Sequence, residues 1–216
     1  MRINKYLALK KISTRRGADE LIKNKKVFIN GKLALLGSKV DEKDKVEVRG
    51  YTPEACVYFA YNKPAGIETS SPQAELFSIG RLDKNSHGLL ILTNDGRITD
   101  QLLNPKYVHE KEYLVKTKEK LRSNFKQKME AGVNIEGYMT KKCSVKILNE
   151  NTFRIVLTEG KKHQIRRMCS ALFQEVADLK RERIMNIKLG NLKPNATREI
   201  RGEELETFLD SLNKKL

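Results

Sequence analysis

The segment at residues 80–96, GRLDKNSHGLLILTNDG, constrains the fold of this chain strongly. Its apolar run at 88–92 is followed at once by turn residues at 94–96, a pattern typical of a buried strand. Asp83 lies in the polar stretch that leads into this strand. A carboxylate at that place is held rigidly and kept partly dry, as a catalytic carboxylate must be. An ordinary turn or cap aspartate has the same spacing, so the position alone leaves both interpretations open.

The charge of the chain indicates a polyanionic partner. Lysine and arginine total 43 of the 216 residues against 27 acidic residues, which gives a formal net charge of +16. Nucleic acid and an acidic membrane face both suit such a surface. No apolar run approaches the ~20 residues that a membrane-spanning helix needs, and the N-terminus lacks the apolar core of a signal peptide. We therefore expect a cytoplasmic protein that binds nucleic acid and no membrane.

The sequence lacks the usual patterns of metal and cofactor sites. Cys56, Cys143 and Cys169 are far apart and form no CxxC pair, and the three histidines have no metal-ligand spacing. Glycine-rich loops that bind nucleotides or methyl donors are also missing from the sequence, which argues against an RNA methyltransferase. We expect no metal and no cofactor, so that side chains alone carry the chemistry.

Residues 1–50 have the pattern of a small domain. Apolar residues recur at helical spacing within 3–7 and 18–22, and short strands are expected on both sides of the Asn-Gly hairpin signal at 30–31. About half of the excess positive charge of the chain falls in this domain. A solvated charged surface would have the same composition, so charge alone does not establish binding. Residues 51–56 have no periodic pattern, and we expect them to form a linker.

The remainder, residues 57–216, predicts an α+β fold. Strand-like runs outnumber helical runs and are often joined by short links. This favours a mainly antiparallel or mixed sheet over a doubly wound one. Helical patterns occupy 121–131, 162–172 and 202–212.

Two further motifs carry reactive or charged side chains. Tyr113 lies in the β-prone stretch KEYLV, where a half-buried strand aromatic is the ordinary interpretation. The second motif, EGKKHQIRRM, crowds the start of a predicted helix with Lys161, Lys162, His163, Arg166 and Arg167. Each cation at a helix N-terminus costs a few tenths of a kcal/mol, roughly, and a bound phosphate would offset that cost. A run of solvated charges is the alternative.

The segments GRLD, KEYLV and EGKKHQIRRM together resemble the signature of bacterial RNA pseudouridine synthases. The resemblance implies a pseudouridine synthase catalytic domain that needs no cofactor and in which Asp83 is the nucleophile. It also implies that Tyr113 stacks on the target base and can handle a proton, and that Arg166 is the ion-pair partner of Asp83.

The same resemblance assigns the remaining basic residues of these motifs to RNA binding. The uridine must leave the base stack before its base can turn over, so the target nucleotide is flipped into a pocket. Arg81 would fill or guard the space that the base vacates, and Lys161 and Arg167 would bind backbone phosphates. Asn85 stands where relatives often have aspartate, so this position supplies no second carboxylate near the site.

The first 40 residues, from RINKYLALKK to LLGSKV, resemble the RNA-binding domain named after small-subunit ribosomal protein four. In that family the second helix lies against structured RNA. The contact positions are occupied here by Arg15, Arg16, Lys23, Lys25 and Lys26. Such contacts reach mostly phosphates and RNA shape, so they position the protein without selecting a base.

The resemblance continues through residues 176–200, where RIMNIKLG is most similar to synthases that modify large-subunit (23S) ribosomal RNA. We therefore expect 23S ribosomal RNA as the substrate and a monomeric enzyme. A substrate in small-subunit ribosomal RNA or in transfer RNA stays open. A non-catalytic RNA-binding or ribosome-assembly protein is a further alternative, although such a protein has no need of a nucleophile.

Overall fold

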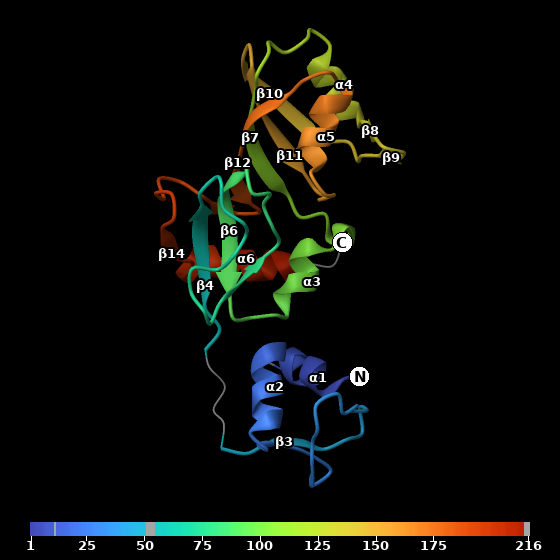
Figure 1. Cartoon of the computed structure of the whole chain (residues 1–216), viewed down its shortest axis with the longest axis vertical. Helices are drawn as coiled ribbons and strands as arrows, with labels where there is room; N and C mark the ends of the chain where they lie inside the picture. The colour runs from blue at the N-terminus through green and yellow to red at the C-terminus, as the bar shows by residue number, and fades with distance from the viewer. Residues whose placement is uncertain (11, 51–54, 214–216) are drawn as a thin grey trace. The chain divides into compact units, whose positions relative to one another are not determined.

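The structure is a computed structural model that describes residues 1–10, 12–50 and 55–213. It divides into two units, one made of Met1–Val57 with Thr93–Thr99 and the other of Tyr58–Leu92 with Asp100–Leu216. Figure 1 shows the elements of each unit. Most of the predicted linker, residues 51–54, lies outside the described residues. The predicted domain boundaries stay predictions.

The smaller unit contains two helices and a three-stranded sheet. Its elements are α1 (Ile3–Leu9), α2 (Arg15–Lys23), β1 (Val27–Ile29), β2 (Lys32–Leu33) and β3 (Val46–Val48), in the sheet order β2-β1-β3. The apolar faces expected from the helical spacing form its core, which includes Ile3, Leu7 and Leu21. Asn30 and Gly31 have φ angles of 51° and 77°. Positive φ at both residues is what the predicted two-residue hairpin turn requires.

A nine-stranded mixed sheet organises the larger unit. Its order is β10-β11-β7-β12-β6-β4-β14, with β13 paired to β12 and β5 paired to β6. β12 and β6 are parallel, whereas β10–β11, β11–β7, β7–β12 and β14–β4 are antiparallel. The strands are β4 (Tyr58–Lys63), β5 (Phe77–Ile79), β6 (His87–Thr93), β7 (Lys111–Thr117), β10 (Ser144–Asn149), β11 (Thr152–Leu157), β12 (Val176–Ile184), β13 (Ile187–Lys188) and β14 (Thr197–Glu199). The predicted α+β class is confirmed.

The helices lie along this sheet, with α4 and α5 beside β10 and β11 (Figure 1). They are α3 (Ile98–Leu103), the 3-10 turn η1 (Pro105–Tyr107), α4 (Phe125–Ala131), α5 (Gln164–Ala171) and α6 (Gly202–Asn213); a hairpin joins β8 (Asn134–Ile135) to β9 (Tyr138–Met139). Phe125, Ile165 and Met168 enter one apolar core with residues of β7 and β11. α4 begins at Phe125 and not at residue 121, as the periodicity had predicted. Among the described residues, no helix is both long enough and apolar enough to span a membrane.

The predicted buried strand is β6, and Gly88 near its start allows β12 to approach. Leu89, Leu90 and Ile91 are fully buried. Gly88 has a φ of +101°, and a Cβ built there would clash with the backbone of Arg181, its partner on β12. The parallel pairing that positions the loop before β6 therefore requires glycine at this place.

We predict that Gly88→Ala lowers the free energy of unfolding by about 3 kcal/mol, because it adds a backbone clash to an unfavourable φ. Gly137→Ala is the matched control, since Gly137 also has a positive φ of +85° but open space around its Cβ position. It should cost only about 1 kcal/mol. Denaturant unfolding of both variants measures the difference, and equal losses would contradict the clash.

Candidate active site

Asp83 lies in the loop between β5 and β6, and the structure fixes this loop through its backbone. The hydroxyl of Thr69 donates to the carbonyl oxygen of Leu82 at 2.7 Å and accepts from the Leu82 amide at 3.0 Å. The Ser86 amide donates to the carbonyl oxygen of Asp83 at 2.9 Å. The carboxylate itself stays about one third exposed. Asp83 is thus an accessible acidic group on a loop with little freedom.

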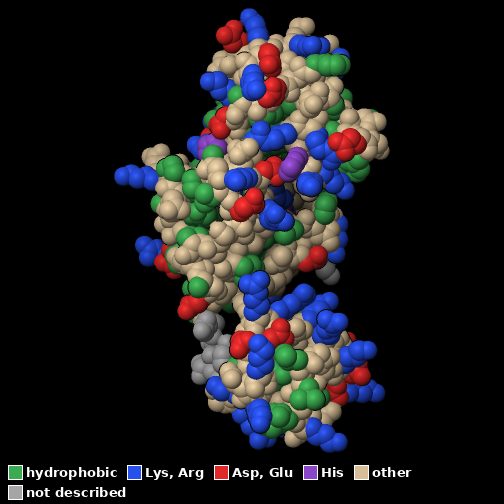
Figure 2. All heavy atoms as spheres, viewed as in Figure 1, with side chains coloured by type: hydrophobic (Ala, Val, Ile, Leu, Met, Phe, Trp, Pro, Cys, Tyr) green, Lys and Arg blue, Asp and Glu red, His purple; other side chains and the backbone are tan. Residues whose placement is uncertain are grey.

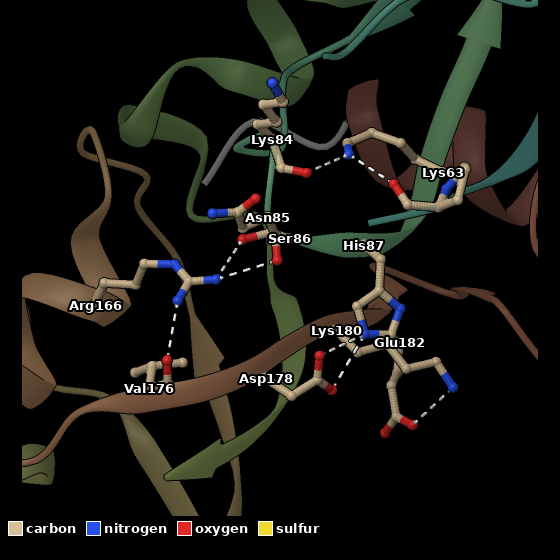
Figure 3. A network of polar contacts seen from close by, with 11 residues as sticks. Lys63, Lys84, Asn85, Ser86, His87, Arg166, Val176, Asp178, Lys180 and Glu182 are labelled. Carbon is tan, nitrogen blue, oxygen red and sulfur yellow. Dashed lines mark hydrogen bonds and ion pairs between the residues drawn. The ribbon is translucent and has the colours of Figure 1, made fainter. Parts of the chain in front are cut away.

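Lys63, the last residue of β4, anchors the same loop through its side chain. Its side chain is fully buried, and Nζ donates to the carbonyl oxygens of Pro64 at 2.9 Å, Ile67 at 2.7 Å and Lys84 at 3.3 Å. Figure 3 shows this lysine reaching the residue that follows Asp83. Burial lowers the pKa of Lys63, and the negative charges of Glu68 and Asp83 partly oppose that shift. A buried lysine that satisfies carbonyl groups is uncommon, because lysine is almost always exposed.

Arg166 holds the loop from the other side. It extends from α5, and its guanidinium donates to the carbonyl oxygen of Asn85 at 3.3 Å, the hydroxyl of Ser86 at 3.3 Å and the carbonyl oxygen of Val176 at 3.2 Å (Figure 3). The predicted ion pair between Arg166 and Asp83 is not formed. The planar guanidinium instead spans backbone and hydroxyl acceptors on two segments, so Arg166 acts on the loop and not on the carboxylate.

The His163 side chain lies against the carboxylate of Asp83. Its Nε2 lies 3.2 Å from Oδ1 of Asp83, and its side chain is about half exposed. His163 is also the N-cap residue of α5 and has the left-handed conformation, with a φ of 52°. Such a conformation is unusual for a residue other than glycine and clusters at functional sites. In the sequence, His163 stands out only as one of several basic residues at the start of this helix.

The turn before α5 is built on a buried carboxylate. Glu159 accepts hydrogen bonds from the amide of Lys141 at 3.0 Å, the hydroxyl of Tyr138 at 2.6 Å and the side-chain amide of Gln164 at 2.7 Å. Gln164 in turn accepts from the amide of Lys161 at 2.8 Å. This network fixes the turn 159–164 and therefore the direction of the His163 side chain.

Comparison with known proteins gives one consistent answer. The family model for RNA pseudouridylate synthase matches residues 57–171, and the S4 domain model matches residues 1–46. The dual-specificity RNA pseudouridine synthase RluF of Escherichia coli is 40% identical over 95% of this chain and 77% of its own length. The chain belongs to the RNA pseudouridine synthases. Ribosomal large subunit pseudouridine synthase B of Bacillus subtilis is 34% identical over 95% of this chain and 94% of its own.

A solved structure supports the same family. A crystal structure of a pseudouridylate synthase matches with a TM-score of 0.71 and 27% identity, over 98% of this chain and 99% of that chain. The match extends over both units. The pseudouridine synthase fold expected from the three sequence motifs is therefore confirmed.

Tyr113, expected to hold the base, lies on β7 and is half-buried against the core of the synthase domain. Its cross-strand neighbours are Ile155 on β11 and Arg181 on β12. Arg181 is in turn paired with Gly88 at the start of β6, so β7 lies two strands away from the strand that Asp83 precedes. The tyrosine is thus on the sheet that carries the Asp83 loop.

The expected RNA contacts of the synthase domain differ in their surroundings. Arg81 is exposed. Lys161 places Nζ 4.3 Å from the centre of the Tyr138 ring. Arg167 is less free, because it pairs with Glu136 at 2.7 Å and donates to the carbonyl oxygen of Ile135 at 3.2 Å. Figure 2 shows basic and histidine side chains around a hollow on the visible face of this unit.

The expected contacts of the S4 domain lie on α2 and just after it. Arg15, Arg16, Lys23 and Lys25 are exposed, and Lys26 is half-buried and donates to the carbonyl oxygen of Gly50 at 3.3 Å. Lys23 also pairs with Glu20 on the same helix, at 2.7 Å. The set therefore lies along one helix and its C-terminal turn, and its role in RNA binding stays a prediction.

Proposed function

We propose that this synthase converts a specific uridine of large-subunit (23S) ribosomal RNA to pseudouridine, with Asp83 as the nucleophile and the target nucleotide flipped out of its stack. The arrangement of the Asp83 loop carries the proposal. The buried Lys63 and the partly exposed Arg166 both bond to the backbone of the loop, while the Asp83 carboxylate stays accessible. A carboxylate fixed in place and open to a substrate is what nucleophilic catalysis needs.

In the proposed reaction the base detaches from the sugar at N1, turns over and reattaches through C5. Asp83 attacks either the sugar or the base ring. Tyr113 holds the flipped base by stacking, and Arg81 occupies the space that the base leaves. Arg166 holds the Asp83 loop in place through its hydrogen bond to the carbonyl oxygen of Asn85. The reaction involves no redox step and no group donor. Lys161 and Arg167 bind backbone phosphates. To do so, Arg167 must give up its ion pair with Glu136 and take the phosphate as its new partner.

The choice of ribosomal RNA is supported by the printed names of the relatives. The Bacillus subtilis protein is named for the large ribosomal subunit, and RluF is named for dual specificity. We propose that residues 1–50 anchor the RNA, that residues 57–216 carry the reaction, and that the enzyme works as a monomer in the cytoplasm. A transfer RNA is the alternative second substrate.

Mapping of pseudouridines in cells with and without this protein tests the substrate. Large-subunit RNA, small-subunit RNA and transfer RNA from both strains would be compared. We expect one or a few sites in large-subunit RNA to disappear when the protein is absent. Loss only in small-subunit RNA or transfer RNA would overturn the proposed substrate, and no loss anywhere would favour a non-catalytic ribosome-assembly role.

We predict that the double variant Arg15→Ala, Arg16→Ala weakens RNA binding and lowers its salt dependence. Two fewer phosphate contacts should reduce the slope of log affinity against log salt by about 2. The double variant Lys188→Ala, Lys193→Ala removes the same charge from exposed positions of the larger unit and should leave the slope unchanged. Filter-binding titrations at several salt concentrations measure both, and equal slopes for the two variants would contradict an RNA-binding role for α2.

A further inference from the structure

Two cations beside Tyr113 lack a carboxylate partner. Arg181 is only 4% exposed, and its Nε donates to the carbonyl oxygen of Leu89 at 2.7 Å. One terminal nitrogen of its guanidinium is buried without a hydrogen-bond partner, and the guanidinium lies 5.9 Å from the centre of the Tyr113 ring. Arg181 takes part in none of the ion pairs among the described residues. It is therefore a nearly dry cation held by one carbonyl oxygen and one aromatic ring.

Lys111 brings a second positive charge to the same place. It lies two residues before Tyr113 on β7, and alternate strand residues point to the same face of the sheet. Its Nζ is 3.5 Å from the carbonyl oxygen of His109 and also takes part in no ion pair within the described part of the chain. Burial and the charge of Arg181 lower the pKa of Lys111 to about 8. At neutral pH the lysine is still mostly protonated.

The carboxylates next to Lys111 in the sequence are occupied elsewhere. Glu110 and Glu112 both pair with Arg183, at 3.0 Å and 2.9 Å. Two cations in a poorly solvated place without an anion cost stability, and each makes the other less favourable. An anion that enters this place would reverse both effects. The arrangement therefore indicates a ligand that carries negative charge.

The position beside Tyr113 identifies which part of the substrate that is. This inference rests on the proposed function, in which the Tyr113 ring holds the uracil. A phosphate stays hydrated and belongs at the edge of a site, whereas the base enters its dry part. We propose that Lys111, supported by Arg181, stabilises the negative charge that develops on the uracil ring during the reaction.

The chemistry of the reaction supplies this charge. When the N1–C1′ bond breaks, its electron pair stays with the base, and the charge spreads to O2 and O4. Addition of Asp83 to the base ring would also place charge on O4, so both routes need a cation here. After the base has turned, C5 bonds to C1′, the C5 proton passes to water and N1 takes up a proton from water. Lys111 keeps its own proton throughout and acts as a fixed charge.

Variants of Lys111 test the proposal in the full-length protein. Lys111→Met should lower the single-turnover rate at saturating enzyme by about 10²–10³-fold, as the loss of one preorganised charge does. RNA affinity should change by less than about twofold, because the charge develops only after binding. The melting temperature should stay the same or rise, because a buried charge is removed. Lys111→Arg keeps the charge and should retain most of the rate.

Lys116→Met is the matched control, because Lys116 lies on the same strand and is exposed. It should leave the rate unchanged. An RNA with 5-fluorouridine at the target position separates charge stabilisation from a structural effect. Fluorouracil is more acidic and leaves more easily, so Lys111→Met should slow the loss of fluorouridine much less than the loss of uridine.

Three results would overturn the proposal. They are an unchanged rate in Lys111→Met, an equal reduction of the rate with uridine and with 5-fluorouridine, or a loss of RNA affinity without a loss of rate. The last would identify a phosphate contact. Asp83→Asn measured in parallel separates this inference from the proposed function. An active Lys111→Met beside an inactive Asp83→Asn overturns the inference alone, whereas an active Asp83→Asn overturns the proposed nucleophile.

Discussion

Asp83→Asn should abolish pseudouridine formation and leave folding and RNA affinity nearly intact. The two side chains have the same shape, but an amide is no nucleophile. Loss of a catalytic nucleophile lowers rates by about 10⁴-fold or more. The contact with His163 lies at the surface, where even a charged pair contributes only about 0–1 kcal/mol, so the free energy of unfolding should change little. Single-turnover assays and denaturant unfolding measure the two quantities.

Asp178→Asn is the control for this variant. Asp178 on β12 also pairs with a histidine, His87, at 2.9 Å, and is about half exposed. The substitution alters a similar contact between a carboxylate and a histidine without touching the proposed nucleophile. Its rate should stay within about threefold of the wild type, given the small value of exposed ion pairs. A wild-type rate in Asp83→Asn would remove Asp83 from the mechanism.

Arg166→Lys should lower the single-turnover rate by about 10²-fold, the size of effect that a misplaced catalytic group produces. A lysine keeps the charge but loses the planar fork that reaches Asn85, Ser86 and Val176 together. The Asp83 loop would then keep the contacts of Thr69 and Lys63 but lose that of Arg166. The variant should stay folded, because the apolar face of α5 is unchanged.

Arg167→Lys, one residue further along α5, should be mild. Arg167 bonds to Glu136 and to the carbonyl oxygen of Ile135, and its proposed phosphate contact accepts either cation. At saturating enzyme, a loss of RNA affinity does not change the measured rate. The two variants therefore differ only in how well they position the catalytic groups. Equal and small effects at both positions would show that the contacts of Arg166 with the loop do not position Asp83 for the reaction.

The strands and helices that position the site were predictable from local patterns. β6 is a short apolar run between turn residues, and α5 has its buried residues, Ile165 and Met168 among them, at helical spacing. The position of Asp83 at the entrance to a buried strand also follows from the sequence. These features depend on residues near one another in the chain, which is why periodicity and turn chemistry reveal them.

The contacts that hold the Asp83 loop were not predictable in this way. Lys63 and Arg166 act on backbone carbonyl groups of distant segments, and every residue has such a group, so no residue type marks the partner. His163, and not Arg166, lies against Asp83, because the left-handed backbone of His163 just before α5 turns its side chain toward the carboxylate. Hydrogen bonds from Tyr138 and Lys141 to Glu159 hold the turn that carries His163, so contacts between distant segments place this side chain beside the carboxylate.

Tritium release tests the central claim most directly. Pseudouridine formation replaces the C5–H bond of uridine by a C5–C1′ bond, so RNA labelled with tritium at C5 loses its label only at the modified site. Purified wild-type protein should release tritium from 23S ribosomal RNA up to a fixed plateau of one or a few uridines per molecule, and Asp83→Asn should release none. No release by the wild type from this RNA, or release by Asp83→Asn at the wild-type rate, would contradict the account.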